Sequence, residues 1–148
     1  MRSVFETRFA KIGETAEHYR TYIINSTFDA VLFADQVLRG YFSDKKDAEE
    51  LLVISLDTKH RPIRIVRATR GTLNASLIHP REVFRPAIHD AAASILLAHN
   101  HPSGDSIPSR EDKQVTKRLM QAGEIVGIQV LDHIVVGDRC VSILESGL

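Results

Sequence analysis

Residues 99–112 read His99-Asn100-His101-Pro102-Ser103-Gly104-Asp105-Ser106-Ile107-Pro108-Ser109-Arg110-Glu111-Asp112. In an extended backbone, side chains two residues apart point to the same side, so His99 and His101 can reach one ion. Ser109 and Asp112 lie three residues apart where a helix is expected to begin, and the prolines and glycine before them allow a sharp turn. Two imidazole nitrogens and one carboxylate oxygen are a familiar zinc ligand set that leaves a fourth position for water. The stretch therefore predicts a catalytic metal site.

Each half of this pattern also has a purely structural interpretation. Ser109 and Asp112 have the spacing of a helix N-cap followed by an acidic residue at N3. That role is compatible with metal binding, because a helix N-terminus can also carry a ligand. His99 and His101, taken alone, are also typical of ordinary histidines at the end of a strand. The two pairs at fixed spacing, with turn residues between them, favour the metal site.

A family resemblance agrees with this interpretation. The pattern His-x-His, seven residues, then Ser-x-x-Asp resembles the metal motif of JAMM (MPN-domain) metallopeptidases. The tighter string from His99 to Asp105 is similar to the bacterial RadC-like branch of that family, and the similarity covers roughly residues 24–148. Three flanking segments also resemble that branch, namely residues 71–76, 79–82 and 131–138.

The resemblance implies a fold, a reaction and a set of site residues. The fold would be α/β of the MPN/JAMM type, cytidine deaminase-like, with a mixed sheet flanked by helices. The activity would be Zn²⁺-dependent hydrolysis of a peptide or isopeptide bond in a peptide or protein substrate. In the family pattern His99, His101 and Asp112 are the metal ligands, and Ser109 donates to the tetrahedral oxyanion. Full-length RadC-like proteins also carry a helix-hairpin-helix region, which this chain is expected to lack.

The reaction also needs a general base that takes a proton from the zinc-bound water, whose pKa zinc lowers to about 7. JAMM enzymes use an upstream glutamate, and in RadC-like chains it precedes an apolar strand that ends in Leu-Asp. Counting back from Leu56 and Asp57 points to Glu49, with Glu50 as the alternative. Neighbouring residues of a strand face opposite sides, so only one of the two can face the metal. Glu82 lies in the first turn of a predicted helix, where the helix dipole already explains a carboxylate.

Other polar residues around the motif are given structural roles. Asp105 is expected to form the turn, with a role in orienting a histidine as the alternative. Asn100 is expected to point away from the ligands and support the loop. His133 lies in a predicted strand where nothing nearby has ligand spacing, so a metal role is not favoured. Cys140 opens an apolar run and is expected to be a buried packing residue, because free cysteine packs as a small hydrophobe.

The composition of the chain is that of one ordinary globular domain. The chain has 148 residues, of which 43% are hydrophobic and 26% charged, and its single cysteine excludes an internal disulfide. A reduced, cytoplasmic location is expected, since no signal-like segment or run of membrane-spanning length is present. Lys plus Arg and Asp plus Glu both number 19, so no basic footprint supports DNA binding.

Two functions from different classes are compatible with these observations. The first is the zinc metallohydrolase described above. The alternative is a non-catalytic binding module associated with DNA repair, a role long attached to RadC-like proteins. An intact ligand set argues against a scaffold that has lost its metal. A homodimer is a further expectation that the sequence leaves open.

The chain divides into an N-terminal arm, residues 1–25, and a single domain, residues 26–148. A helix is expected to begin at Ser26-Thr27 and extend toward Tyr41. A second helix is expected from Pro80 and a third from Ser109 to about Gly123. Strands are predicted at residues 51–56, 62–66, 73–78, 94–98, 128–136 and 139–144.

Overall fold

A five-stranded mixed sheet forms the centre of the molecule. The computed structural model describes residues 19–43, 48–71, 73–74 and 76–148. The strands lie in the order β2-β1-β3-β4-β5, and only the β3–β4 pair is parallel. Their bounds are β1 Glu50–Leu56, β2 Pro62–Arg70, β3 Ser94–Asn100, β4 Gln129–Val136 and β5 Cys140–Ser142. The predicted α/β fold with a mixed sheet is confirmed.

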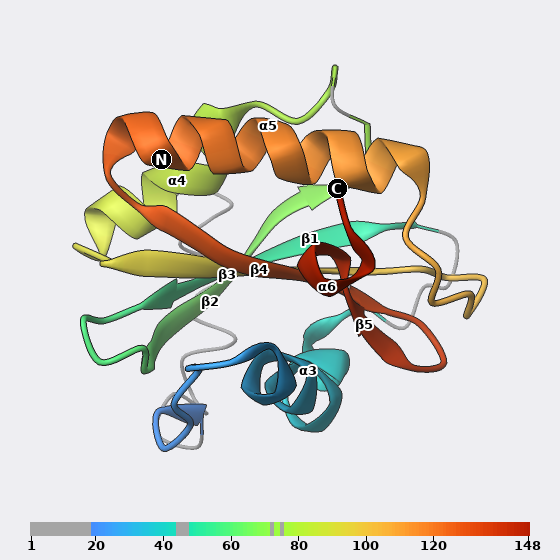
Figure 1. The fold of residues 1–148 in the computed structure, drawn as a ribbon, viewed down its shortest axis with the longest axis horizontal. Helices are drawn as coiled ribbons and strands as arrows, with labels where there is room; N and C mark the ends of the chain where they lie inside the picture. The colour runs from blue at the N-terminus through green and yellow to red at the C-terminus, as the bar shows by residue number, and fades with distance from the viewer. Residues whose placement is uncertain (1–18, 44–47, 72, 75) are drawn as a thin grey trace.

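Helices cover both faces of this sheet. Figure 1 shows α4 and α5 on one side and α3 on the other. The sheet therefore separates two apolar layers, and a residue's place in the alternation of a strand decides which layer it enters. The helices are α3 Thr27–Gln36, the short 3₁₀ helix η1 Leu38–Tyr41, α4 Pro80–His89, α5 Arg110–Val126 and α6 Ile143–Ser146.

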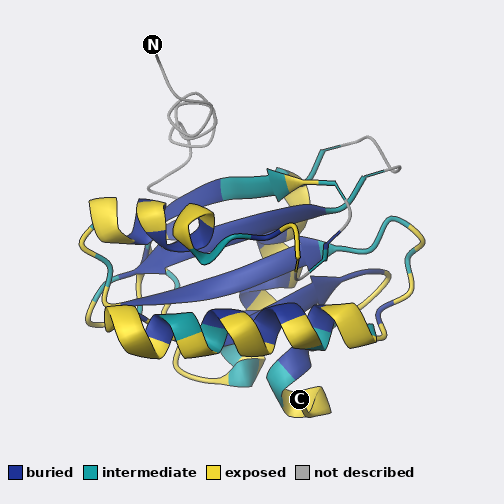
Figure 2. Ribbon diagram, turned by 90° about the horizontal axis from the view of Figure 1, so that it is seen from above, coloured by how far each residue is buried: buried dark blue, intermediate teal, exposed yellow. Residues whose placement is uncertain are grey.

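Strand β1 illustrates how the two layers are built. All seven of its residues are buried, as expected for a strand covered on both faces. Leu52 and Ile54 pack in the cluster that contains Phe33 of α3. Leu51 and Val53 pack instead with Val115 and the other apolar residues of α4 and α5. Figure 2 shows the resulting pattern, with buried strands lying between helices that are exposed on their outer sides.

The helix boundaries follow from local capping. The Ser26 side chain accepts a hydrogen bond from the Asp29 amide and begins α3. Pro80 occupies the first turn of α4, where its missing N–H costs nothing. Ser109 begins α5, and Gly127 ends it in the left-handed conformation with φ 78°. The predicted helix starts are confirmed, and α5 extends three residues beyond the expected end at Gly123.

Strand β4 contains a β-bulge that sets which of its side chains face each layer. Ile95 of β3 pairs with Val130, but Leu96 pairs with Asp132, so Leu131 is an extra residue. Val130 packs on the α4–α5 face. Counting on from the bulge, Asp132 faces the α3 side and His133 faces the α5 side.

One strand prediction is wrong, and another extends too far. The described residues of the 73–78 segment, 73–74 and 76–78, are not in a strand, because the Asn74 carbonyl accepts from the amides of Leu77 and Ile78 and turns the chain. The strand predicted at residues 139–144 ends at Ser142, whose side chain caps the short helix α6. Both segments are apolar, and local hydrogen bonds decide their conformation.

Smaller differences concern a strand end and the cysteine. The strand predicted at residues 62–66 is longer, because β2 continues to Arg70 beside β1. Cys140 is half-buried rather than buried, and its Sγ accepts from Arg39 Nη2 at 3.3 Å.

The N-terminal arm falls mostly outside the described residues. Residues 1–18 of the predicted 1–25 arm are not described, and the boundary stays a prediction. Within the described end of the arm, Tyr19 and Ile24 are buried in the cluster that contains Phe33. Among the described residues, no helix is both long and apolar enough to cross a membrane.

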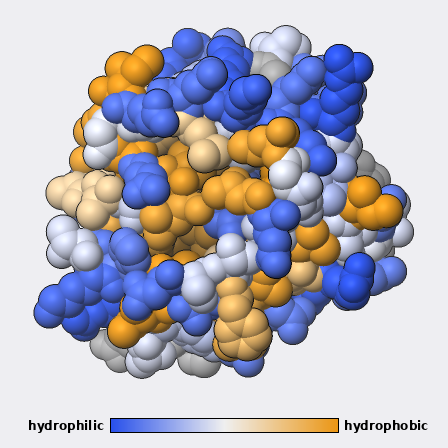
Figure 3. Space-filling model, in the orientation of Figure 1, coloured by the Kyte–Doolittle hydropathy of each residue, from blue (hydrophilic) through white to orange (hydrophobic). Residues whose placement is uncertain are grey.

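Some apolar surface stays exposed on the outer helices. Figure 3 shows apolar side chains gathered toward the middle of the face seen in Figure 1, with hydrophilic ones around them. Exposed large apolar residues lie on α3, at Phe28 and Leu32, and at the end of α5, at Ile125 and Val126. The homodimer considered from the sequence stays a prediction.

Candidate metal centre

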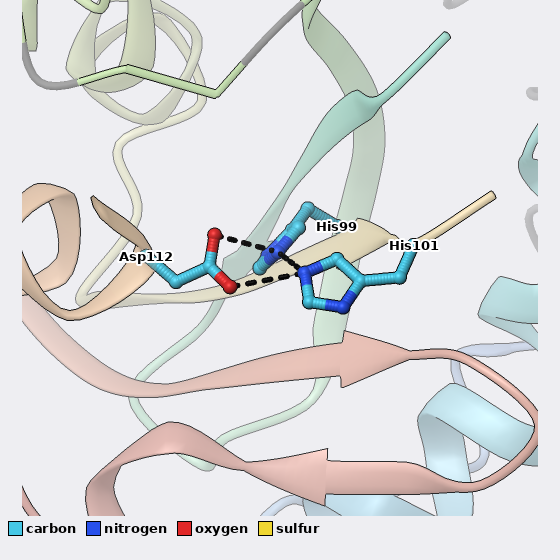
Figure 4. Close-up of side chains that lie close together, drawn as sticks. All are labelled: His99, His101 and Asp112. Carbon is cyan, nitrogen blue, oxygen red and sulfur yellow. Dashed lines mark hydrogen bonds and ion pairs between the residues drawn. The ribbon is translucent and has the colours of Figure 1, made fainter. Parts of the chain in front are cut away.

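Three side chains converge at one end of β3. His99 Nε2 lies 3.0 Å from His101 Nε2 and 3.2 Å from Asp112 Oδ1, and His101 Nε2 lies 3.0 Å from Asp112 Oδ2. Figure 4 shows the two rings and the carboxylate pointing toward one another. These residues form a group of side chains that could hold a metal ion. The structure therefore brings together the three ligands predicted from the sequence.

The fold explains why these three residues meet. His99 lies on β3 in the alternation that places Ile95 and Leu97 on the α4–α5 face. His101 lies two residues after His99, just beyond the end of β3, so its side chain emerges on the same side. Asp112 is in the first turn of α5, which lies over that face. A strand end and a helix start thus approach the same point.

The spacing of the ligand atoms fits a small tetrahedral ion. Ligands bound at about 2.05 Å to a tetrahedral zinc ion lie about 3.3 Å from one another. The three separations here are 3.0, 3.0 and 3.2 Å. Imidazole nitrogens also favour zinc and its transition-metal neighbours over magnesium or calcium. The donor set therefore fits a zinc ion with one further coordination position.

The loop that follows His101 is anchored to the turn between β4 and β5. The His101 amide donates to the Val136 carbonyl at 3.0 Å, and the Asp138 amide donates to the Gly104 carbonyl at 2.7 Å. Ser106 Oγ donates to the Arg139 carbonyl and accepts from the Arg139 amide, both at 2.9 Å. These bonds hold the loop on the sheet and bring Asp112 back toward the histidines.

Gly104 is required in this loop for two reasons. Its φ is +87°, a backbone conformation that residues with a Cβ atom rarely adopt. A Cβ atom at this position would also lie 2.6 Å from Asp138 Oδ1. The backbone must therefore pass close to the Asp138 side chain in a conformation that suits glycine.

We expect Gly104→Ala to lower zinc affinity by about 10-fold or more, the range for changes that displace a ligand's supporting groups. The substitution strains the loop that carries the support of His101. Chelator competition measures the affinity, and thermal unfolding measures stability. The matched control is Gly127→Ala, which imposes similar strain at φ +78° with open space around it. Equal zinc affinities for the two variants would contradict the assigned role of the loop.

Asp105 orients His101 through its backbone rather than its side chain. His101 Nδ1 donates to the Asp105 carbonyl at 2.7 Å, because a carbonyl oxygen can only accept. This bond leaves His101 Nε2 facing the site. The Asp105 side chain accepts from the Ile107 amide at 3.0 Å and shapes the turn. Both roles considered for Asp105 are therefore present, carried by different atoms.

Asn100 points away from the ligands, as expected, but its side chain bonds the segment at the start of β1 rather than the loop after His101. Its side-chain oxygen accepts from the Glu50 amide at 2.6 Å, and its nitrogen donates to the Ala48 carbonyl at 3.2 Å. These bonds join the end of β3 to the start of β1 without involving the ligands.

A buried histidine supports His99, and sequence reasoning missed it. His99 Nδ1 lies 2.7 Å from His133 Nε2, and His133 Nδ1 lies 2.6 Å from Thr116 Oγ1. The Thr116 hydroxyl donates to the Asp112 carbonyl at 2.7 Å. The one sequence feature that could have indicated this support is the four-residue spacing of Asp112 and Thr116, which places both on one face of the helix. His133 comes from the neighbouring strand, and its approach is a tertiary contact.

The charges in the site are strongly coupled. Burial alone would raise the pKa of Asp112, but hydrogen bonds from His101 and His99 hold that pKa well below its usual range. The hydrogen bond to Asp112 is the main reason that the pKa of His101 is raised. Burial holds the pKa of His133 well below its usual value. Asp112 is thus held as a carboxylate, the form that binds metals.

Ser109 is the N-cap of α5, as predicted. Its Oγ accepts from the Asp112 amide at 3.0 Å, and Asp112 Oδ2 accepts from the Ser109 amide at 2.8 Å. This reciprocal pair is a capping box. The Ser109 bond uses only a lone pair of the oxygen, so the hydroxyl proton is left for another acceptor.

The two candidate glutamates lie on opposite faces of the sheet edge. Glu50 is buried, pairs with Arg67 at 2.9 Å and accepts from the Ser43 amide. Glu49 is the residue before Glu50 and lies two positions before Leu51. It is therefore on the same face as Leu51 and Val53, which is the face of the metal site. Leu51 pairs with His99 in antiparallel register, so Glu49 lies on the His101 side. Its charge is among the smaller causes that raise the pKa of His101, after Asp112.

Glu49 is also held by the segment that was predicted to be a strand. Glu49 Oε2 accepts from the Leu73 amide at 3.1 Å. Glu82, the third glutamate considered, is exposed in the first turn of α4. The helix dipole explains that position, as expected.

Comparison with known proteins identifies the family. The model of the RadC-like JAB domain matches residues 29–148. This chain belongs to the RadC-like JAB domain family. The match contains all three residues of the candidate metal centre, as well as Glu49 and Ser109.

Curated relatives of this RadC-like JAB domain are bacterial. A UPF0758 protein of Geobacter sulfurreducens is 48% identical over 118 residues, covering 77% of this chain and 51% of the relative. UPF0758 proteins of Trichlorobacter lovleyi (54% identical, 68% of this chain, 44% of the relative) and Rubrobacter xylanophilus (51%, 77%, 50%) are similar. The chain spans about half the length of these relatives. Their names state no activity, so membership in the RadC-like JAB family gives the fold and the motif.

Proposed function

We propose that this RadC-like domain is a zinc-dependent hydrolase that cleaves peptide or isopeptide bonds. The observation that carries the proposal is the convergence of two imidazoles and one buried carboxylate with tetrahedral spacing. Three protein ligands leave one coordination position for a reactant, which separates a catalytic zinc site from a structural one. The peptide substrate class rests on the resemblance to JAMM metallopeptidases.

His99, His101 and Asp112 would hold the zinc ion. When bound, zinc supplies Lewis acidity and lowers the pKa of a water in its open position to about 7. The protein fixes the ligands before the ion arrives: the Asp105 carbonyl orients the His101 ring, and the Ser109 amide orients the Asp112 carboxylate. Such preorganisation lowers the cost of assembling the site.

Glu49 is the proposed general base. Its carboxylate lies on the same face of the sheet edge as the ligands, and its bond to the Leu73 amide restrains it there. A carboxylate within reach of the attacking water accepts its proton and returns it to the leaving amine. Glu50, the alternative, is committed to Arg67 on the opposite face.

Ser109 is the proposed donor to the developing oxyanion. Its Oγ is held by the Asp112 amide, next to one ligand of the centre. Its hydroxyl proton is not used by that bond. A preorganised donor of this kind contributes roughly 3 kcal/mol in well-studied hydrolases.

Elemental analysis of the purified protein tests the proposal first. After chelation and reconstitution with zinc, we expect about one zinc per chain, the stoichiometry of a three-ligand site. His101→Ala is expected to lose it. The zinc form is then screened against peptide and isopeptide libraries, with the chelated form as the control. Iron(II) is measured as well, because two histidines and a carboxylate also bind it in oxygenases.

Each result of this test has a distinct meaning. Zinc binding together with metal-dependent peptide cleavage supports both the zinc site and the peptidase activity. A zinc-loaded protein without cleavage of any peptide would leave the metal site in place and refute the peptidase. A protein that prefers iron, or binds no metal, would refute the zinc hydrolase altogether.

A further inference from the structure

A continuous row of hydrogen bonds runs from the backbone of α5 to the candidate ligand His99. The Thr116 hydroxyl lies 2.7 Å from the Asp112 carbonyl and 2.6 Å from His133 Nδ1, and His133 Nε2 lies 2.7 Å from His99 Nδ1. Thr116, His133 and His99 are all fully buried. We call these three residues the Thr116–His133–His99 chain. Figure 4 shows its end, the His99 ring facing Asp112 and His101.

The direction of every bond in this chain is set at its Thr116 end. The Asp112 carbonyl oxygen can only accept, so Thr116 must use its single proton there. Two oxygens that lie 2.7 Å apart without a proton between them would repel each other. Thr116 Oγ1 must then accept from His133, which places a proton on His133 Nδ1.

The same reasoning fixes both histidines. His133 is fully buried, and a second proton would leave it charged in an apolar layer. Its Nε2 therefore accepts, and His99 Nδ1 carries the donated proton. The remaining nitrogen, His99 Nε2, faces His101 and Asp112, where it is the atom that can present a lone pair to an ion.

We propose that Thr116 and His133 are positioning residues that hold His99 in the one tautomer able to bind a metal through Nε2. The opposite tautomer would place a proton on Nε2, where the ion must sit. This inference rests on the metal site of the proposed function, but it does not depend on peptidase activity. Partners of this kind beside metal-binding histidines fix the ring orientation and raise the basicity of the ligand.

His101 is oriented by a different device. Its Nδ1 donates directly to the Asp105 carbonyl, so its tautomer depends on a loop. His99 is oriented by side chains from α5 and β4 instead. The orientations of the two ligand rings are therefore set independently. Substitutions of Thr116 or His133 are expected to change the orientation of the His99 ring and not that of the His101 ring.

Nitrogen-15 NMR of the histidine rings tests the proposal in the unaltered protein. In metal-free protein at neutral pH, we expect both His99 and His133 to carry a proton on Nδ1. Zinc should leave both Nδ1 protons in place. A His99 ring protonated on Nε2 and bare on Nδ1 in the metal-free protein would overturn the proposal. This measurement needs no variant and no substrate.

Two matched variants supply the second readout. Thr116→Val keeps the shape and removes the hydroxyl, whereas Thr116→Ser keeps the hydroxyl and removes a methyl group. Zinc affinity from chelator competition should fall about 10- to 100-fold in Thr116→Val, the usual range for partners of metal-binding histidines. Thr116→Ser should restore it to within a few-fold of the parent.

Thermal unfolding of the metal-free forms separates positioning from packing. If Thr116→Val binds zinc as tightly as the parent, or if Thr116→Ser loses as much affinity as Thr116→Val, the positioning role is wrong. If Thr116→Val does not fold, the NMR result on the parent protein still decides. A protein with the expected tautomers and zinc affinities that cleaves no peptide would refute the proposed function and leave this inference standing.

Discussion

Replacing Asp112 with asparagine is expected to lower zinc affinity by more than about 100-fold, which exceeds the usual effect of changing a supporting residue. Asp112 is 2% exposed and presents one oxygen to each histidine. Asparagine keeps the size of the side chain and one oxygen that can accept from the Ser109 amide. The substitution therefore removes the negative charge that the ion requires while disturbing the capping box little. Chelator competition with zinc measures the loss.

Glu111→Gln is the matched control for this variant. Glu111 is the neighbouring acidic residue in the first turn of α5 and is exposed. The Glu111→Gln substitution removes one negative charge from the same helix terminus and leaves the three ligand side chains unchanged. Its zinc affinity should equal that of the parent, and circular dichroism should show both variants folded. Parent-like zinc binding by Asp112→Asn would remove Asp112 from the ligand set.

Glu49→Gln is expected to keep zinc and lose turnover. The amide cannot accept a proton from water at neutral pH, and general-base catalysis contributes about 10²- to 10⁴-fold in enzymes. The fall should appear in kcat for a peptide found in the library screen. Zinc content should stay at the parent level, because Glu49 lies outside the group of ligands. Full activity in Glu49→Gln would move the role to Glu50 or refute the general base.

Glu50→Gln is the companion to that experiment and should behave in the opposite way. Glu50 is 1% exposed and neutralises Arg67. Arg67 is partly exposed, so losing this partner costs at most about 3 kcal/mol of unfolding free energy, the value for a fully buried ion pair. The variant should therefore unfold at a lower denaturant concentration than the parent. Its folded fraction should keep its zinc content and its activity. Loss of turnover without loss of stability in Glu50→Gln would exchange the roles of the two glutamates.

The parts of the site that could be predicted from the sequence are those fixed by short-range geometry. His99 and His101 are two residues apart on one strand, and Ser109 and Asp112 form a capping box within one turn. Local rules describe both arrangements. The loop between them contains the glycine that its φ of +87° requires. Spacing alone therefore indicated which three side chains would meet.

The parts that could not be predicted depend on partners far away in the sequence. His133 is 34 residues from His99 and reaches it across two paired strands. The bulge at Leu131 also shifts the alternation of β4, so Val130 and His133 face the same layer although they lie three positions apart. A strict period of two assigns them to opposite layers. Only the pairing with β3 reveals the extra residue.

The incorrect strand at residues 73–78 has a related cause. Its apolar pattern suits a strand, but the Asn74 side chain accepts from the Ser76 amide and hydroxyl and bends the chain. The result is a loop whose Leu73 amide holds Glu49. The contacts of the neighbouring residues Glu49 and Glu50 differ, and the sequence alone could not show this difference.

The parallel pair β3–β4 and its connecting helix α5 have a consequence for local unfolding. All three candidate ligands, together with Thr116 and His133, belong to this one β-α-β unit and its loop. A bound cation would therefore act as a cross-link inside a single cooperative unit. Opening of β3 or α5 would then require release of the ion, whereas the hairpin of β1 and β2 could still open without it. Zinc would thus make the stability of this domain uneven, greatest in the unit that carries the chemistry.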